Sequence, residues 1–448
     1  MDFSPHTPED IAGMLEVIGL GNLEDLFESI PEGVRLDREL DVPGALSEPE
    51  LVDHLSGLAA RSRGAGELVC FAGGGVYDHH IPSAVKALAS RAEFATSYTP
   101  YQAELSQGIL QSLYEFQSLV CSLYGMEVAN ASLYDGANAV VEAVNLSVRF
   151  TQRERVVIGA TVHPHYRDVL KTYTAGLGLD IITAPFDPAA GIVDWDEVDV
   201  EGCAALVLAY PNVFGGLEDV RGAAEKAHGA GAVAIVAADP TAMGVLEAPG
   251  VMGADVAVGE GGALATSPAY GGPYVGLFAT KSPFVRQVPG RISGETADAD
   301  GRRAFVLTLQ AREQHIRRAK ATSNVCTNQT LLAVATAVHL AWLGPHGLRR
   351  LGEVCARRTA FAALRLGEIP GCALRFEGPR FKELVLETPV DGGELATRLA
   401  GRGFLAGPGL GRWWPELANC LLVAVTERRT EDHILAFAEA IEKELAEL

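Results

Sequence analysis

Hydroxyl, amide and carboxylate side chains crowd the segment between residues 97 and 108. Tyrosine hydroxyls and a carboxylate can hold or move protons, and amphipathic aromatic rings suit a wet pocket or an interface. A simple surface connection would also be polar. However, two tyrosines, a proline and a glycine in so short a span favour a shaped functional surface. The candidate catalytic residues are Tyr98, Thr99, Tyr101, Glu104 and Ser106.

A second candidate site is the start of a predicted helix that follows Asn130–Asp135. Free N–H groups at a helix N-terminus bind anions such as phosphate, and a small residue such as Gly136 lets a ligand approach the backbone. Asp135 or Asn138 could instead cap these N–H groups. Both interpretations remain open on this segment alone.

Asp239 follows a predicted central strand, Val233–Ala238. In enzymes that use pyridoxal phosphate (PLP), an acid at such a position pairs with the pyridinium nitrogen, although many α/β strands end in aspartate. The lysine that forms the Schiff base should then lie on the next strand-end loop. That loop, residues 258–268, contains Gly262 but no lysine. The sequence therefore predicts a degenerate site near Gly136, Asp239 and Gly262, on a chain that cannot hold PLP covalently by itself.

The chain has only seven lysines, and Lys281 is the first one after this loop. It comes at the end of the next predicted strand, where a solvent-facing charge is typical. A stand-alone aminotransferase or decarboxylase that used Lys281 or Lys320 is an alternative hypothesis. A reducible PLP adduct on the isolated chain would support it.

Basic side chains gather between residues 310 and 324 of a chain that is otherwise acidic. Arginine and lysine in such a setting indicate a contact with a carboxylate or another anion, or an interface. An exposed helix with pairs such as Glu313 and Arg317 would explain the same pattern. The candidates for substrate or interface contacts are Arg291, Arg317, Lys320, Ser323 and Asn324.

The formal net charge is −21 over 448 residues. A surface of this sign repels nucleic acid and anionic membranes, so neither is an expected partner. The seven cysteines include no C-x-x-C pair, which predicts free thiols in a reducing compartment. The N-terminus has no signal-peptide pattern, and no apolar run approaches the roughly 20 residues of a membrane span, so a cytoplasmic location is expected. His79 and His80 are adjacent and would point in different directions on a strand, so no metal site is predicted.

The order of predicted elements indicates an α/β fold. A helical extension is expected over residues 1–64, where Thr7–Asp10 and Ser47–Glu50 carry helix-capping patterns. A large, mostly parallel-sheet domain is expected over residues 65–325, because short apolar runs alternate there with helical stretches. A smaller C-terminal α/β domain is expected over residues 326–448. Ligands of such parallel sheets bind beyond the carboxyl ends of the strands.

The predicted strands of the large domain are Glu67–Phe71, Arg155–Gly159, Ala205–Ala209, Val233–Ala238, Asp255–Val258 and Tyr274–Ala279. Those of the small domain are Ala373–Phe376, Glu383–Glu387 and Leu421–Thr426.

Taken together, these segments resemble the P-proteins of the glycine cleavage system, glycine dehydrogenase (decarboxylating). More narrowly, they resemble the alpha chains, or subunit 1, of the form that is split into two chains. The resemblance runs nearly end to end, and it implies the PLP-dependent transferase fold of type I. The segments that carry it include Phe71–Pro82, Tyr98–Gly108, Asn130–Ala137, Gly290–Ile292, Gln310–Gln329 and Trp413–Thr430.

The resemblance implies an α2β2 heterotetramer in which the lysine-bearing beta chain holds PLP and this chain keeps the same fold in degenerate form. The two chains together would decarboxylate glycine and pass the aminomethyl group to the lipoyl arm of the H-protein. This chain alone would be inactive, and residues 98–106 would shape the site from across the interface. The alternative is a non-catalytic structural pseudoenzyme that stabilises the beta chain or docks the H-protein.

Overall fold

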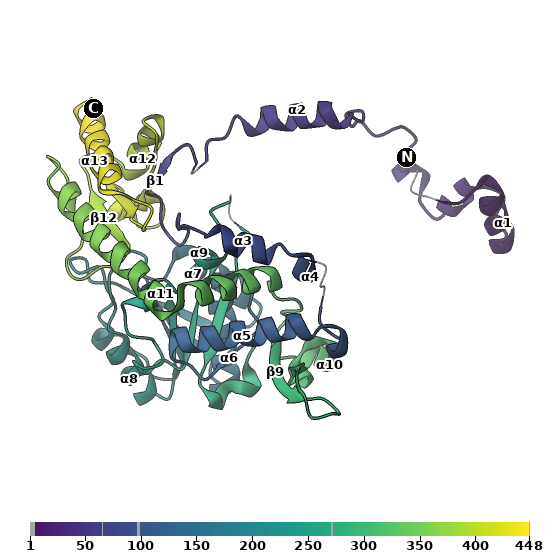
Figure 1. The fold of residues 1–448 in the computed structure, drawn as a ribbon, viewed down its shortest axis with the longest axis horizontal. Helices are drawn as coiled ribbons and strands as arrows, with labels where there is room; N and C mark the ends of the chain where they lie inside the picture. Colours follow the sequence, from purple (N-terminus) through teal and green to yellow (C-terminus); the bar gives the residue numbers. More distant parts are fainter. Residues whose placement is uncertain (1–4, 65, 96–98, 270–271, 448) are drawn as a thin grey trace. The chain divides into compact units, whose positions relative to one another are not determined.

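The computed structural model describes residues 5–64, 66–95, 99–269 and 272–447. The chain forms two compact units, Met1–Ser62 and Arg63–Leu448 (Figure 1). The division of the second unit into a large and a small domain near residue 325 stays a prediction, as does the three-domain scheme as a whole.

The first unit consists of short helices joined by extended chain. Its elements are α1 (Pro8–Ile18), a 3₁₀ helix (Leu23–Phe27), a single 3₁₀ turn (Glu32–Val34) and α2 (Glu48–Ala59). The side chain of Thr7 accepts a hydrogen bond from the Asp10 N–H, while the Asp10 carboxylate accepts one from the Thr7 N–H. Ser47 and Glu50 form the same reciprocal capping box at the start of α2. The capping patterns in the sequence are therefore confirmed.

The second unit is built on a seven-stranded mixed sheet with the strand order β2-β8-β7-β6-β5-β3-β4. Strands β3 to β7 are parallel, whereas β8 is antiparallel to both of its neighbours. The strands are β2 (Val128–Ala129), β3 (Arg155–Gly159), β4 (Asp180–Ala184), β5 (Cys203–Tyr210), β6 (Val233–Ala238), β7 (Val256–Glu260) and β8 (Gly276–Thr280).

Helices cover both faces of this sheet because its central strands are apolar on both sides. Along β5, Leu206 and Leu208 pack with α5 (Gln107–Tyr124), α8 (Val220–Gly229) and the first part of α11. Val207 points the other way and packs with α6 (Gly136–Thr151) and α7 (Pro164–Thr174). Helices α5 and α11 run side by side (Figure 1).

Helix α11 (Thr330–Gly367) is the one helix in the described part of the chain that is long and apolar enough to cross a membrane. Its buried residues, among them Ala333 and Leu340, contribute to the core, and the helix packs against α3 (Ser83–Ala89), α5 and α9 (Gly262–Ala265). Gly344 has a non-helical conformation and interrupts it. It is a core helix, not a membrane span.

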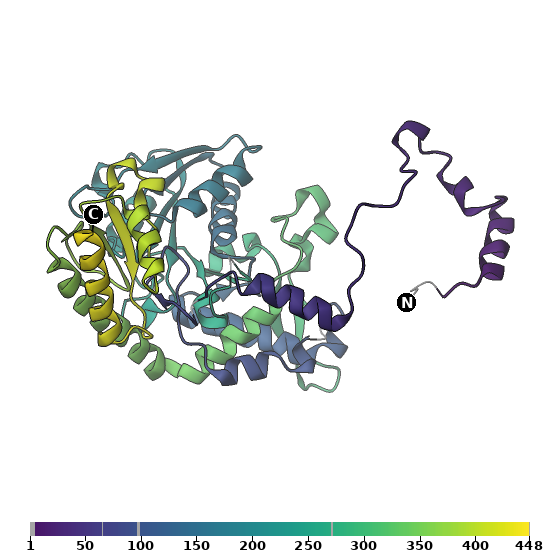
Figure 2. The same ribbon diagram turned by 90° about the horizontal axis from the view of Figure 1, so that it is seen from above.

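The C-terminal part contains a three-stranded antiparallel sheet, β11 (Ala373–Leu374), β12 (Glu383–Glu387) and β14 (Cys420–Ala424). Helices α12 (Gly392–Gly401) and α13 (Glu431–Ala446) pack on it through a separate apolar cluster. This part is drawn in yellow and yellow-green in Figure 2.

The prediction that the strand Glu67–Phe71 belongs to the large sheet is wrong. Its ordered part, β1 (Val69–Cys70), pairs in parallel with β13 (Phe404–Leu405) of the C-terminal part. The reason is side-chain packing, because the ring of Phe71 stacks on that of Phe437 with centroids 4.2 Å apart. An apolar strand pattern does not say which sheet the strand joins.

A separate β hairpin packs against α5. It is formed by β9 (Ile292–Ala297) and β10 (Arg303–Thr308), which are antiparallel. The remaining helices are α4 (Ala92–Ala95) and α10 (Gln314–Arg317).

Candidate functional site

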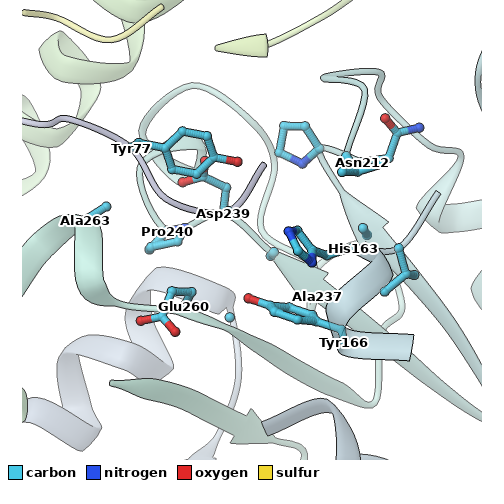
Figure 3. A pocket seen from close by; sticks show the side chains of 16 residues that line it. Tyr77, His163, Tyr166, Asn212, Ala237, Asp239, Pro240, Glu260 and Ala263 are labelled. Atoms are coloured by element: carbon cyan, nitrogen blue, oxygen red, sulfur yellow. The ribbon is translucent and has the colours of Figure 1, made fainter. Parts of the chain in front are cut away.

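A pocket lies where the carboxyl ends of β5, β6 and β7 meet the N-terminus of α6, which is where a doubly wound sheet binds its ligand. The side chains of Tyr77, His163, Tyr166, Asp239 and Glu260 line it and converge on one space (Figure 3). The structure thus brings together the degenerate site predicted from Gly136, Asp239 and Gly262.

The anion position at the start of α6 is filled by a side chain of the protein itself. Glu260, the last residue of β7, accepts hydrogen bonds from the N–H groups of Gly136 (2.9 Å), Gly262 (2.8 Å) and Val275 (3.1 Å). The Asp135 carboxylate caps the same helix by accepting from the Asn138 N–H at 2.7 Å. The capping interpretation of this segment is therefore confirmed for Asp135, and the N–H groups of Gly136 and Asn138 both donate to carboxylates of the chain itself.

The acid that would face a pyridinium nitrogen is also engaged. Asp239 forms an ion pair with Lys382, whose side chain is only 1% exposed. Asp239 also accepts hydrogen bonds from the N–H and the hydroxyl of Thr241, at 2.8 and 2.7 Å. Burial raises the pKa of Asp239, but the Lys382 ammonium and these hydrogen bonds outweigh burial, so that the net shift is downward. The carboxylate is held in its charged form.

Lys382 is surrounded by groups that satisfy its charge. Its ammonium lies 3.5 Å from the centre of the Tyr77 ring and 3.3 Å from Nε2 of His79. Nδ1 of His79 in turn lies 2.6 Å from a carboxylate oxygen of Glu427. Cys355 lies nearby, and its thiol, His79 and Glu427 place possible metal-ligand atoms within 4.8 Å of one another. The adjacent ammonium disfavours a metal cation, so the group is a buried network of charges and hydrogen bonds.

The pocket does not fit PLP. The strand-end loop between β7 and β8 supplies no amine to the aldehyde, the phosphate position holds Glu260, and the pyridinium position holds Lys382. Lys382 cannot replace the missing Schiff-base lysine, because it lies against the carboxylate that would face the ring nitrogen, opposite the aldehyde carbon. Lys281 follows β8, which is antiparallel to β7, and it pairs with Asp255, which directly precedes β7. Lys281 therefore lies at the opposite end of β7 from Glu260.

A separate polar cluster forms around Arg291, just before β9. The guanidinium donates hydrogen bonds to the hydroxyls of Thr99 (3.3 Å) and Tyr101 (3.2 Å), and it lies 5.2 Å from the centre of the Tyr101 ring. Its Nε is 3.9 Å from a carboxylate oxygen of Glu313, and His315 lies 3.8 Å from the same oxygen. We call these five residues the Arg291 cluster.

The Arg291 cluster combines a buried charge pair with an exposed rim. Arg291 and Glu313 are 3% and 6% exposed, whereas Tyr101 is 56% exposed. Arg291 Nε and one oxygen of Glu313 have no hydrogen-bond partner among the described residues. Buried polar atoms without partners are costly. The cluster is therefore suited to receiving a polar group from a substrate or from another chain.

The other predicted residues lie outside this cluster. Tyr98 falls outside the described residues. Glu104 is exposed in the 3₁₀ helix Ala103–Leu105, and Ser106 caps α5 without a side-chain hydrogen bond.

In the basic segment, Arg317 donates to the Ala311 carbonyl and the Asn324 carbonyl accepts from Gln314. Ser323 accepts from the Val325 N–H, and Lys320 is exposed. The structure thus joins Thr99 and Tyr101 to Arg291, but it does not join them to Arg317, Lys320, Ser323 or Asn324 through any contact between described residues.

Sequence reasoning missed Glu260 and Lys382, and it paired Glu313 with Arg317, whereas the structure pairs the buried Glu313 with Arg291. Glu260 could have been found, because it is an acid at a strand end directly before Gly261 and Gly262. No local signal identified Lys382, which lies far along the chain from Asp239.

Three buried carboxyl groups, Glu142, Glu260 and Glu383, have pKa values raised by burial to about 7. Folding raises the pKa of each group from 4.5. Each protonated carboxyl group therefore contributes its full stabilisation below pH 4.5, and this contribution is lost as the pH rises through about 7. Glutamine cannot ionise, so we expect the stability of Glu260→Gln to fall less than that of the natural chain as the pH rises through this range. Its Tm relative to the natural chain should rise by a few degrees between pH 5 and pH 8, as measured by thermal unfolding.

The matched control for this pH experiment is Glu104→Gln, which removes an exposed carboxyl group. The Tm difference between the control and the natural chain should not depend on pH. A constant difference for Glu260→Gln as well would mean that Glu260 does not titrate in this range.

The chain matches the sequence model of the glycine cleavage system P-protein over residues 1–441. It is 46% identical to a probable glycine dehydrogenase (decarboxylating) subunit 1 of Desulforamulus reducens, with 97% of this chain and 98% of that protein aligned. It is 44% identical to the protein of the same description from Moorella thermoacetica, with both chains covered completely.

The structural comparison agrees with the sequence comparison. A crystal structure of a glycine decarboxylase (P-protein) of the glycine cleavage system, in inhibitor-bound form, superposes with a TM-score of 0.90 at 44% identity. The two chains are covered to 99% and 100%. A glutamate decarboxylase of Lactobacillus brevis, at 13% identity and a TM-score of 0.66, shares the fold alone. The fold is the PLP-dependent transferase fold of type I, and the chain belongs to the P-protein family of the glycine cleavage system, as subunit 1 of the two-subunit glycine dehydrogenase (decarboxylating).

Proposed function

We propose that a second, lysine-bearing subunit holds PLP and that this chain completes the active site from across their interface. The assembly is an α2β2 heterotetramer located in the cytoplasm. It decarboxylates glycine and transfers the remaining aminomethyl group to the lipoyl arm of the H-protein. PLP, bound by the partner, supplies the sink for the electron pair that is left when CO2 departs.

The observation that carries this proposal is the filled pocket at the strand ends. The Glu260 carboxylate satisfies the N–H groups that would bind phosphate, and the Lys382 ammonium satisfies Asp239. Displacing either group for PLP would leave a buried charge without its partner, which costs several kcal/mol. This chain therefore supports a PLP site on the other subunit better than one of its own.

The Arg291 cluster is the part of this chain that we assign to the shared site. The guanidinium holds the hydroxyls of Thr99 and Tyr101 in place and keeps the Tyr101 ring at the surface. A guanidinium beside hydroxyl groups can orient a carboxylate, such as that of glycine. Tyr101 and Glu104 are exposed, and the hydroxyl of Tyr101 and the carboxylate of Glu104 could orient the amine or hold a proton.

The test is glycine-dependent exchange of labelled CO2 with PLP and lipoylated H-protein. We expect activity when this chain is mixed with its subunit 2, and none with either chain alone. Borohydride should fix PLP to subunit 2 only. Exchange, or a reduced PLP adduct, on this chain alone would contradict the proposal.

A second candidate function is that of a structural pseudoenzyme, which stabilises subunit 2 or docks the H-protein without contributing to the chemistry. The pocket filled by Glu260 and Lys382 favours this function, because buried hydrogen bonds and ion pairs make the chain rigid. The orphaned polar atoms of the Arg291 cluster favour participation instead, since a scaffold gains nothing from them. Substitution of Tyr101 separates the two functions.

A further inference from the structure

The first unit of the chain exposes an unusual amount of apolar surface. Sixteen of the 32 exposed large hydrophobic side chains described lie within residues 14–58, which is a small part of the chain. In α1, the 3₁₀ helix and α2 together, Leu15 is the single buried residue. Apolar surface on this scale marks an interaction site in a soluble protein.

These side chains are arranged as stripes on the helices. In α2, Leu51, Leu55 and Leu58 follow helical spacing and are 44%, 52% and 46% exposed. By the same spacing, Glu50 lies beside this stripe and Asp53 lies on the opposite side of the helix. In α1, Met14 and Ile18 are four residues apart, so they lie on one face, and they are 45% and 56% exposed. Each helix therefore presents an apolar stripe with acidic flanks.

A hollow adds a concave feature to the first unit. It lies between α1 and the 3₁₀ helix and is lined mainly by apolar side chains, among them Ile11, Met14, Ile18, Leu23 and Leu26. A hollow of this composition suits apolar side chains of a partner.

The charge of the chain limits what can cover this surface. Residues 1–62 carry fourteen acidic and three basic side chains, while the rest of the chain carries 43 acidic and 33 basic ones. The first unit and the rest of the chain are therefore both strongly acidic. A second copy of this chain would meet the acidic flanks with more negative charge, and like charges across an interface are unfavourable.

We propose that residues 5–62 form an arm that clasps subunit 2 of this enzyme. The arm lies in an apolar groove of that subunit whose rim carries lysine and arginine. This inference rests on the proposed two-chain function. The apolar stripes provide affinity, and the acidic flanks set the choice of partner and the dependence on salt.

The test uses the full chain and its subunit 2 with PLP bound. The variant Leu51→Glu/Leu55→Glu changes two side chains that are exposed in the free chain, so its Tm alone should match that of the natural chain. We expect its dissociation constant for subunit 2, measured by calorimetry, to rise by about 100-fold or more, because two buried leucines are lost from the interface. Leu364→Glu, a substitution at an exposed leucine of α11, is the control and should bind normally.

Two further measurements sharpen the result. Addition of subunit 2 should protect the backbone amides of α1 and α2 from hydrogen exchange. Glu50→Gln/Asp53→Asn should reduce the dependence of binding on salt concentration.

Normal affinity of the Leu51→Glu/Leu55→Glu variant, without protection of the arm in the natural complex, would overturn the arm proposal while leaving the two-chain enzyme intact. Self-association of the natural chain that this variant abolishes would overturn it in favour of a second copy. Failure of the natural chain to bind subunit 2 at all would overturn the proposed function together with the arm.

Discussion

Replacing Lys382 by methionine should lower the free energy of unfolding of this chain by about 3–5 kcal/mol. The side chain is 1% exposed, and its ammonium neutralises the largely buried Asp239 carboxylate. Methionine fills a similar volume but carries no charge, so Asp239 would be left as an unpaired charge close to the buried Glu383. Urea-induced unfolding of the full chain measures the loss.

Two variants separate the charge effect from packing. Lys382→Met/Asp239→Asn removes both charges, and we expect it to recover most of the lost stability, because a neutral pair carries no uncompensated charge. Lys281→Met removes a lysine whose partner, Asp255, is 3.8 Å away and whose side chain is 31% exposed. It should cost less than about 1 kcal/mol. Equal stability of the single and double Lys382 variants would contradict the argument.

In the assembled enzyme, Tyr101→Phe should lower kcat by about 100-fold, in the range expected when a group that holds or transfers a proton is lost. The hydroxyl is the atom that accepts from Arg291, and the side chain is 56% exposed, so its removal should not unfold the chain. Affinity for subunit 2 and the PLP content of the complex should not change. Glu104→Gln should also lower kcat. Glycine-dependent CO2 exchange measures these effects.

The matched control for Tyr101→Phe is Tyr173→Phe, which removes the hydroxyl of a tyrosine that is 55% exposed on α7. It should retain the natural rate. Unchanged turnover of both Tyr101→Phe and Glu104→Gln would contradict the participation of this chain in the chemistry. The structural pseudoenzyme would then be the remaining function. Loss of rate together with loss of bound subunit 2 would indicate an interface role for Tyr101 instead.

Local sequence patterns predicted much of the fold. The strands Arg155–Gly159 and Val233–Ala238 begin and end where they were predicted, because a strand buried on both faces needs a short apolar run wherever it pairs. The capping boxes at Thr7 and Ser47 are equally local, since each is completed within four residues. The same kind of reasoning placed Asp239 at a strand end and identified a strand-end loop without lysine.

By itself the sequence determined the parallel sheet, the position of its ligand-binding edge and the lack of a Schiff-base lysine there. Only the tertiary structure decided that Glu260 occupies the anion position, that Lys382 neutralises Asp239 and that Arg291 joins Tyr101. Periodicity and motifs report interactions between neighbours in the chain. A buried ion pair depends on which distant segments the fold places side by side, and no local pattern records that.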